Sequence, residues 1–126
     1  MKTLQIRNST AEFLIFTKQN KEKTIEVIVD EDSVWLSQKL MAELFGTTRN
    51  NITMHLTNIL EEELKENSVC KEFLHTAEDG KNYKTKYYNL DAIIAVGFKV
   101  NSKRAIEFRL WAINILKQYS IKGYVL

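Results

Sequence analysis

The sequence contains no proline and a single cysteine, Cys70. Without proline there are no proline-rich linkers and no cis-proline turns, so glycine, asparagine, aspartate and serine must mark the ends of the elements. One cysteine excludes an internal disulfide and any site built from several thiolates, which agrees with a reducing compartment. No apolar run approaches the roughly 20 residues of a membrane-spanning helix, and the N-terminus lacks the pattern of a signal peptide. We therefore expect a cytoplasmic protein with no membrane partner.

Residue patterns that carry catalysis or hold cofactors are also missing. His55 and His75 have no spacing to Cys, Asp or Glu that would build a zinc site, and there is no glycine-rich phosphate loop or nucleophile elbow. Cys70 lies on a predicted strand, away from any helix start that would lower its pKa, so we predict an inert, half-buried thiol. The acidic residues 30–32 lack the further ligands of a calcium loop and are interpreted as a solvated turn. We predict that the chain is not an enzyme and has no metal or cofactor.

The chain has 126 residues, of which 44% are hydrophobic. This length suits one compact domain with its own core and is too short for two ordinary ones. The net charge is only +2 and the pI is near 8.6, so the distribution of charge matters more than its total. We predict a single domain over residues 1–126 with an α+β fold.

Two β-rich runs, residues 12–17 and 24–29, are separated by a polar stretch. They predict an N-terminal antiparallel hairpin with a loose loop. A third short strand is predicted over residues 34–36, and Ser33 or Ser37 then leads into a helix. Trp35 is interpreted as a core anchor under that helix.

Residues 40–60 carry the pattern of two short helices joined by a tight turn. Apolar residues recur at helical spacing in both halves. Gly46 can adopt the left-handed conformation that ends a helix, and Thr47 or Thr48 can accept amide protons to start the next one. This layout is that of a helix-turn-helix. His55 falls where DNA-binding versions usually have an aliphatic residue, so either the second helix is rotated slightly or His55 covers the edge of the core.

The second helix is predicted to continue until Asn67 or Ser68, and its end is acidic. Four glutamates face one lysine there: Glu61, Glu62, Glu63 and Glu66 against Lys65. We interpret these carboxylates as a solvated face rather than an acid/base pair. Because DNA phosphates repel this end, only the start of the helix can approach a duplex, which is the usual docking of a recognition helix.

The exposed residues near the start of the second helix suit base edges. They are Thr48, Arg49, Asn50, Asn51, Thr53, Met54 and Thr57. Arginine can bind guanine O6 and N7 through two bonds, asparagine can bind adenine likewise, and methionine or a threonine methyl can pack on the thymine methyl. Gln38 and Thr47, at the two helix starts, are placed for phosphate oxygens.

Two strand-like runs, residues 69–76 and 82–88, flank a loop in which Asp79 and Gly80 form a strong hairpin signal. A hairpin directly after a recognition helix is a wing. It carries the lysines that we predict to contact DNA: Lys81, Lys84 and Lys86. Lys84 and Lys86 lie two residues apart and face the same side of the strand. The alternative is an ordinary strand edge blunted by lysines.

Asn89 is placed to cap a short apolar helix over residues 90–96, which Gly97 ends. All faces of this helix look buried, so we interpret it as the central packing element. Further bases, Lys99, Lys103 and Arg104, extend the basic side of the molecule from the hairpin to the start of the next helix.

A long helix is predicted from Asn101 or Ser102 to about Tyr119. Its apolar residues cover more than one stripe, so it either lies deep in the core or keeps one face for a partner. A homodimer through the 102–119 helix is one corollary. The alternative to DNA binding is a protein–protein interaction module that docks through this apolar helix.

Four strings together closely resemble the RhuM family of bacterial virulence-associated proteins: WLSQKLMAELFGTTRNNITMHLTNI, ENSV, TAEDGKNYKTKYYNLDAIIAVGFKVNSKR and FRLWAINILKQYSIKGY. The resemblance covers nearly the whole chain, and YYNLDAIIAVGFKVNSKR is its most specific part. It implies a bacterial cytosolic protein with a DNA-binding N-terminal domain, loosely similar to phage antirepressor N-terminal domains. Because family members typically continue further, we expect this chain to be the N-terminal part of a longer protein.

The residues and the resemblance lead to one hypothesis. We expect a winged-helix-like helix-turn-helix domain with an N-terminal antiparallel hairpin, a β-wing and a long C-terminal helix. Its partner is double-stranded DNA, and its role is that of a transcription regulator or an antirepressor-like protein.

Overall fold

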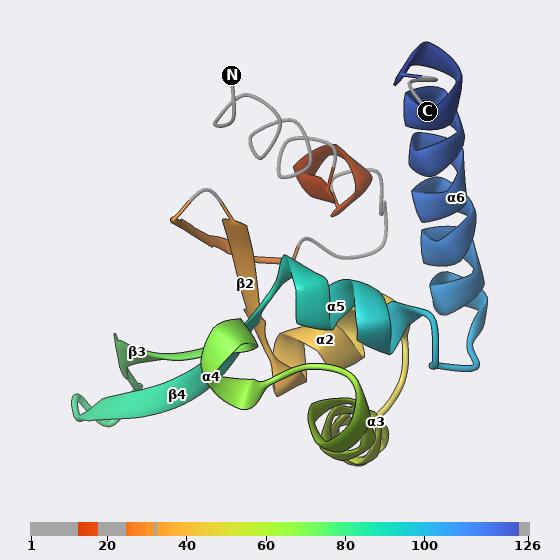
Figure 1. Cartoon of the computed structure of the whole chain (residues 1–126). Helices are drawn as coiled ribbons and strands as arrows, with labels where there is room; N and C mark the ends of the chain where they lie inside the picture. The colour runs from red at the N-terminus through yellow and green to blue at the C-terminus, as the bar shows by residue number, and fades with distance from the viewer. Residues whose placement is uncertain (1–12, 18–24, 32, 124–126) are drawn as a thin grey trace.

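The computed structural model describes residues 13–17, 25–31 and 33–123, with the side chains of the last helix described up to residue 118. In these ranges four strands form one antiparallel sheet of order β1-β2-β4-β3, with helices packed against it (Figure 1). The strands are β1 (Ile28–Asp30), β2 (Ser33–Ser37), β3 (Cys70–Thr76) and β4 (Asn82–Asn89). The helices are α2 (Gln38–Phe45), α3 (Arg49–Glu62), α4 (Glu66–Val69), α5 (Leu90–Gly97) and α6 (Lys103–Gly123). The predicted α+β class is confirmed.

The predicted strand over residues 12–17 is wrong, because residues 13–17 are helical. Phe13 and Phe16, three residues apart on one side of this turn of helix, pack against Phe108 and Trp111 of α6. Burial of these aromatic rings overrides the β-propensity of the run. An N-terminal antiparallel hairpin does form, but between β1 and β2, in the register Ile28↔Trp35 to Asp30↔Ser33.

The strand predicted over residues 34–36 is confirmed as β2, and its side chains alternate between two faces. Leu36 and its partner Tyr88 on β4 are buried in the main core, among residues of α2, α3 and α5. Trp35 is buried on the opposite face, where its ring packs edge-on against Phe73 and its Nε1 donates to the carbonyl oxygen of Asp30 at 3.0 Å. Trp35 therefore anchors the outer face of the sheet and does not lie under α2.

The helix pair predicted over residues 40–60 is confirmed as α2 and α3. Ser37 caps α2, since its Oγ accepts the Leu40 N–H at 3.2 Å. Gly46 ends α2 with φ 62° and ψ 44°, the left-handed conformation that glycine adopts without strain. Thr48 caps α3, since its Oγ1 accepts the Asn51 N–H at 3.1 Å.

The end of α3 differs from the prediction. The helix stops at Glu62, and a separate short helix, α4, follows before β3. Lys65 has an extended backbone between the two helices, and Val69 is buried at the end of α4. Burial of Val69 redirects the chain into β3, a contact that the helical pattern alone does not reveal.

Asn89 caps α5 as predicted, since its Oδ1 accepts the Ala92 N–H at 3.2 Å. The helix ends at Gly97 as predicted, but Gly97 is its last helical residue and Phe98 is the cap, one position later than expected. The absent side chain of Gly97 also makes room: a Cβ at Gly97 would lie 2.5 Å from the ring of Phe108. Not every face of α5 is buried, since Asp91 is exposed.

Ser102, one of the two residues predicted to start this helix, precedes α6 and caps it. Its Oγ accepts the Ala105 N–H at 3.0 Å and donates to the carbonyl oxygen of Phe45 at 2.5 Å, which ties α6 to the end of α2. The helix continues past the predicted end to Gly123 and projects beyond the rest of the described fold (Figure 1). In the described part of the chain, no helix combines the length and the apolar character needed to cross a membrane.

Candidate nucleic-acid interface

The first turn of α3 presents polar side chains to solvent. Arg49 and Asn50 are exposed, as are Thr53, Met54 and Thr57 further along, whereas Asn51 is half-buried. The first turn contains no acidic residue. The positive end of a helix dipole favours acids and disfavours a cation, so helix stability does not explain an arginine at the first position.

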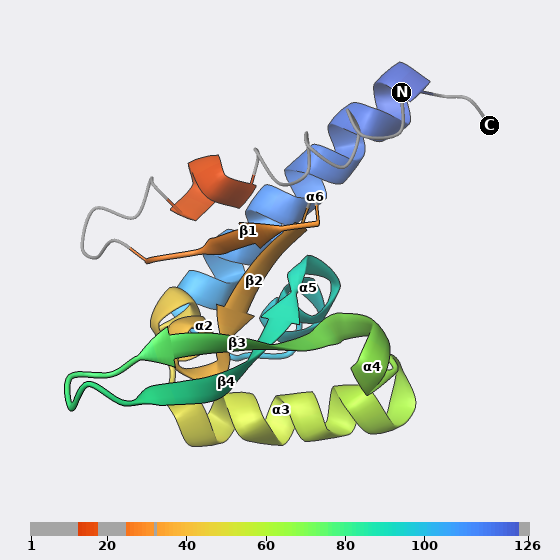
Figure 2. The same cartoon turned by 90° about the vertical axis from the view of Figure 1, so that its left-hand side faces the viewer.

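The start of α3 shares a groove with the β3–β4 hairpin. The hairpin runs alongside α3, with its tip at the same end as the start of that helix (Figure 2). A groove of about 520 Å³ lies here, and its lining includes Arg49 from α3, Lys39 from α2, and Lys84 and Lys86 from β4. Glu26 and Glu43 also line it, so the groove is basic without being free of acids.

The sheet topology leaves room for this groove. In the described part of the chain, β2 ends at Ser37, opposite Tyr87, so no strand pairs with the outer edge of β4 from Asn82 to Lys86. The lysines at positions 84 and 86 lie on this stretch. They reach the start of α3 although they are more than thirty positions away along the chain.

Four of the residues predicted to contact DNA, Gln38, Thr47, Asn51 and Thr53, form hydrogen bonds with other side chains. The Gln38 Nε2 donates to the Tyr88 hydroxyl at 3.1 Å, and the Gln38 Oε1 accepts from the Thr53 Oγ1 at 2.5 Å. The Thr47 Oγ1 accepts from the Asn51 Nδ2 at 2.9 Å. These bonds join α2 to α3 and to β4, and so they hold the start of α3 against the sheet.

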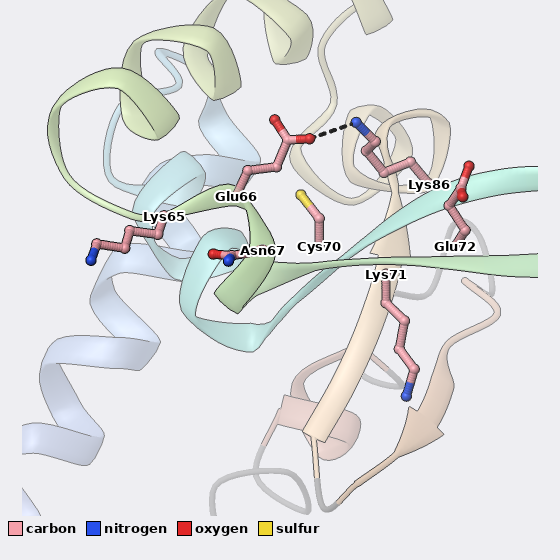
Figure 3. Close-up of a pocket in the computed structure, with 7 residues that line it drawn as sticks. All are labelled: Lys65, Glu66, Asn67, Cys70, Lys71, Glu72 and Lys86. Carbon is pink, nitrogen blue, oxygen red and sulfur yellow. Dashed lines mark hydrogen bonds and ion pairs between the residues drawn. The ribbon is translucent and has the colours of Figure 1, made fainter.

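The hairpin lysines differ in their surroundings. Lys86 forms an ion pair with Glu66 of α4 at 2.9 Å, which raises the pKa of Lys86 (Figure 3). Lys84 is exposed, and no described residue forms an ion pair or hydrogen bond with its ammonium group. Lys81 is exposed in the loop. Of the two hairpin lysines that line the groove, Lys84 is therefore the one whose charge is not compensated by an ion pair with a described residue.

The hairpin predicted from Asp79 and Gly80 forms between β3 and β4, and the Asp79 side chain orders its tip. Its carboxylate accepts the Tyr83 hydroxyl at 2.6 Å and the Lys81 N–H at 2.9 Å, and these bonds lower the pKa of Asp79. Gly80 has φ 82°, a conformation that suits glycine at a turn. The loop that carries Lys81 is therefore held by its own side chains.

The opposite end of α3 is acidic, as predicted. Glu63 forms an ion pair with Lys99 at 2.9 Å, and this pair raises the pKa of Lys99. His55, in the middle of α3, is half-buried, and burial together with the charge of Lys99 lowers its pKa.

The outer face of the sheet holds a cluster of aromatic rings and a lysine that was not predicted from the sequence. Lys71 lies 5.4 Å from the ring centre of Trp35 and 5.5 Å from that of Phe73, and Tyr87 packs edge-on against Phe73. The Lys71 ammonium also forms ion pairs with Asp30 and Glu31, which raise its pKa. The alternation of residues along β3 was the signal that could have predicted this face. The acidic turn is thus bound to a lysine, and the described residues include no cluster suited to a metal ion.

Cys70 lines an open pocket of about 770 Å³ between α4, β3 and β4 (Figure 3). The thiol is half-buried, and burial together with the Glu66 carboxylate raises its pKa to about 11. Since the thiolate is the reactive species, native Cys70 holds roughly a hundredfold less of it than an ordinary cysteine at the same pH.

We expect a thiol-specific reagent at mildly alkaline pH to label native Cys70 on the order of 100-fold more slowly than the unfolded chain, with a rate that keeps rising up to pH about 11. The reaction of the same chain in guanidinium chloride is the control. Equal rates in the two states would show that the thiol is freely reactive.

Comparison with known proteins adds a family for the C-terminal part of the chain. No curated protein and no solved structure matches the sequence. The model described as Virulence protein RhuM family matches residues 68–126. This stretch holds the hairpin, α5 and α6, and with them the string YYNLDAIIAVGFKVNSKR, whereas α2 and α3 lie outside it. The C-terminal part of the chain, residues 68–126, is thus similar to the RhuM family.

Proposed function

We propose that the chain binds duplex DNA as a winged-helix-like domain, with the start of α3 in the major groove and the β3–β4 hairpin as the wing. The observation that carries the proposal is the groove that Arg49 shares with Lys84 and Lys86. These residues come from separate segments and lie on one accessible face. An interaction module with no nucleic-acid partner has no need to gather them there.

The polarity of α3 supports one docking direction. Its start carries Arg49 and two exposed amide or hydroxyl side chains, Asn50 and Thr53, while its end carries glutamates. Phosphates attract the first and repel the second, so the helix enters the groove by its N-terminal turns. In this proposal Lys84 contacts phosphate, while Gln38, Thr47 and Asn51 position α3 through their side-chain hydrogen bonds.

Sequence-selective binding of this kind suits a transcription regulator or an antirepressor-like protein that acts in the cytoplasm.

The proposal is tested with a mobility-shift panel of random duplexes over a range of salt concentrations. We expect binding at low salt. The logarithm of the association constant should fall linearly with the logarithm of the salt concentration, because the lysines and arginines that neutralise phosphates release counterions. Lys84→Ala should weaken binding to all sequences alike and reduce the slope by about 1. Lys65→Ala, an exposed lysine at the acidic end of α3, is the matched control and should leave the slope unchanged. No binding at low salt, or equal slopes for both variants, would contradict the proposal.

The second candidate function is protein docking through α6. It is favoured by an exposed row of large apolar side chains on that helix. The two functions use different faces and do not exclude one another.

A further inference from the structure

Helix α6 has two apolar faces, and the described fold covers one of them. Ala105 and Phe108 are fully buried against the core, and Trp111 is partly buried beside them. On the other side Ile106, Leu110, Ile113 and Leu116 are 47%, 62%, 42% and 63% exposed. They recur every three or four residues and so form one stripe along the helix.

The stripe has the spacing of a short coiled-coil seam. The core positions of a heptad are separated by four and then three residues. This spacing is found at Ile106, Leu110 and Ile113, and Leu116 lies next to them. Lys103 and Lys117 occupy the next seam positions on either side. Single exposed apolar residues are ordinary on a protein surface, whereas a contiguous row of this kind marks an interaction site.

The charges beside the stripe favour pairing with a second copy of α6 that runs antiparallel to the first. In a parallel pair, each seam lysine would face the identical lysine of the second copy, which is unfavourable. In an antiparallel pair, Leu110 lies beside the second copy's Ile113, and Lys117 lies beside its Ile106 and Glu107. Glu107 and Lys117 are both exposed on α6. They are ten residues apart, about 15 Å along a helix, too far to pair within one copy.

We infer that α6 pairs antiparallel with α6 of a second copy of this chain, through Ile106, Leu110 and Ile113, with two symmetric Glu107–Lys117 ion pairs. The side of α6 that packs on the core lies opposite the seam. In the dimer, the rest of each copy therefore lies on the outer side of its own α6, away from the helix–helix contact. This interface is independent of the proposed DNA groove, because none of its residues lines that groove.

The interface is tested first by mass. Sedimentation equilibrium of the full chain should show a concentration-dependent approach to twice the chain mass of 14.7 kDa. Leu110→Glu should remain monomeric, because it places two carboxylates in the seam. Leu74→Glu is the matched control, since Leu74 of β3 is equally exposed at 62%, and it should leave the dimer intact. Circular dichroism checks that both variants fold. A wild-type chain that stays monomeric, or a dimer that Leu110→Glu does not weaken, would overturn the inference.

The orientation is tested by charge reversal. Glu107→Lys and Lys117→Glu should each weaken dimerisation by about 2- to 30-fold, the range expected for two exposed ion pairs. The double variant with both changes should recover the wild-type dissociation constant, since the pairs reform with reversed signs. Single variants that weaken the dimer without recovery in the double variant would overturn the antiparallel arrangement.

Discussion

Arg49→Ala is expected to weaken binding to preferred duplexes by about 1–3 kcal/mol, or about 5- to 150-fold. The guanidinium of Arg49 is exposed at the first position of α3, where it can form two parallel bonds to guanine O6 and N7. In the proposed complex, loss of the guanidinium removes a base contact, so the preference for guanine at one position should decrease. The measurement is selection from a random duplex library, followed by fluorescence anisotropy with the selected and a scrambled duplex.

Two variants separate base reading from charge in this experiment. Arg49→Lys keeps the positive charge but lacks the planar fork, so it should retain the salt dependence and lose the base preference. Lys84→Ala should weaken the selected and scrambled duplexes equally, because a phosphate contact carries no sequence information. If Arg49→Ala also weakens both duplexes equally, Arg49 contacts phosphate and the proposed reading of bases is wrong.

Phe108→Ala is expected to lower the free energy of unfolding by about 3–5 kcal/mol. The Phe108 side chain is fully buried. The centre of its ring lies 5.1 Å from the ring centre of Phe45, 5.4 Å from that of Trp111 and 5.6 Å from that of Phe16. Removing it loses the burial of the ring and leaves a cavity between α2, α6 and the helical residues 13–17. Chemical denaturation, read as the midpoint and slope, measures the loss.

Phe98→Ala is the matched control for this stability measurement. The same ring is removed at the end of α5, where Phe98 is 45% exposed and no closed cavity can form. We expect less than half of the loss seen for Phe108→Ala. Similar losses for the two variants would show that the aromatic cluster around Phe108 is not the centre of the core.

Prediction from sequence succeeded where neighbouring residues satisfy each other's backbone groups. Ser37, Thr48 and Asn89 each accept an amide proton three residues ahead, and Gly46 adopts a conformation that few other residues tolerate. Such caps involve atoms within one turn of helix. The helix pair, the hairpin and the start of α6 were therefore predictable.

Prediction failed where a distant part of the chain decided the local structure. Residues 13–17 have a strand-like composition, yet they are helical because Phe13 and Phe16 both face α6. Gly97 does end α5, but the sequence did not reveal that its missing side chain admits the ring of Phe108. In both cases a packing contact with α6 decides what the local pattern does not show.

The sequence of residues 40–60 predicts a helix pair with Arg49 exposed near the start of the second helix. Arg49 is the first residue of α3, and its side chain is exposed to solvent. The sequence by itself determined the two helices, the end of α2 and the start of α3, since caps and apolar spacing act over three or four residues. Only the tertiary structure decided that Gln38 binds Tyr88, that Lys86 pairs with Glu66, and that Arg49 and Lys84 line one groove. These pairs join residues 20 to 50 positions apart, and their contact depends on how the sheet and helices pack rather than on any local pattern.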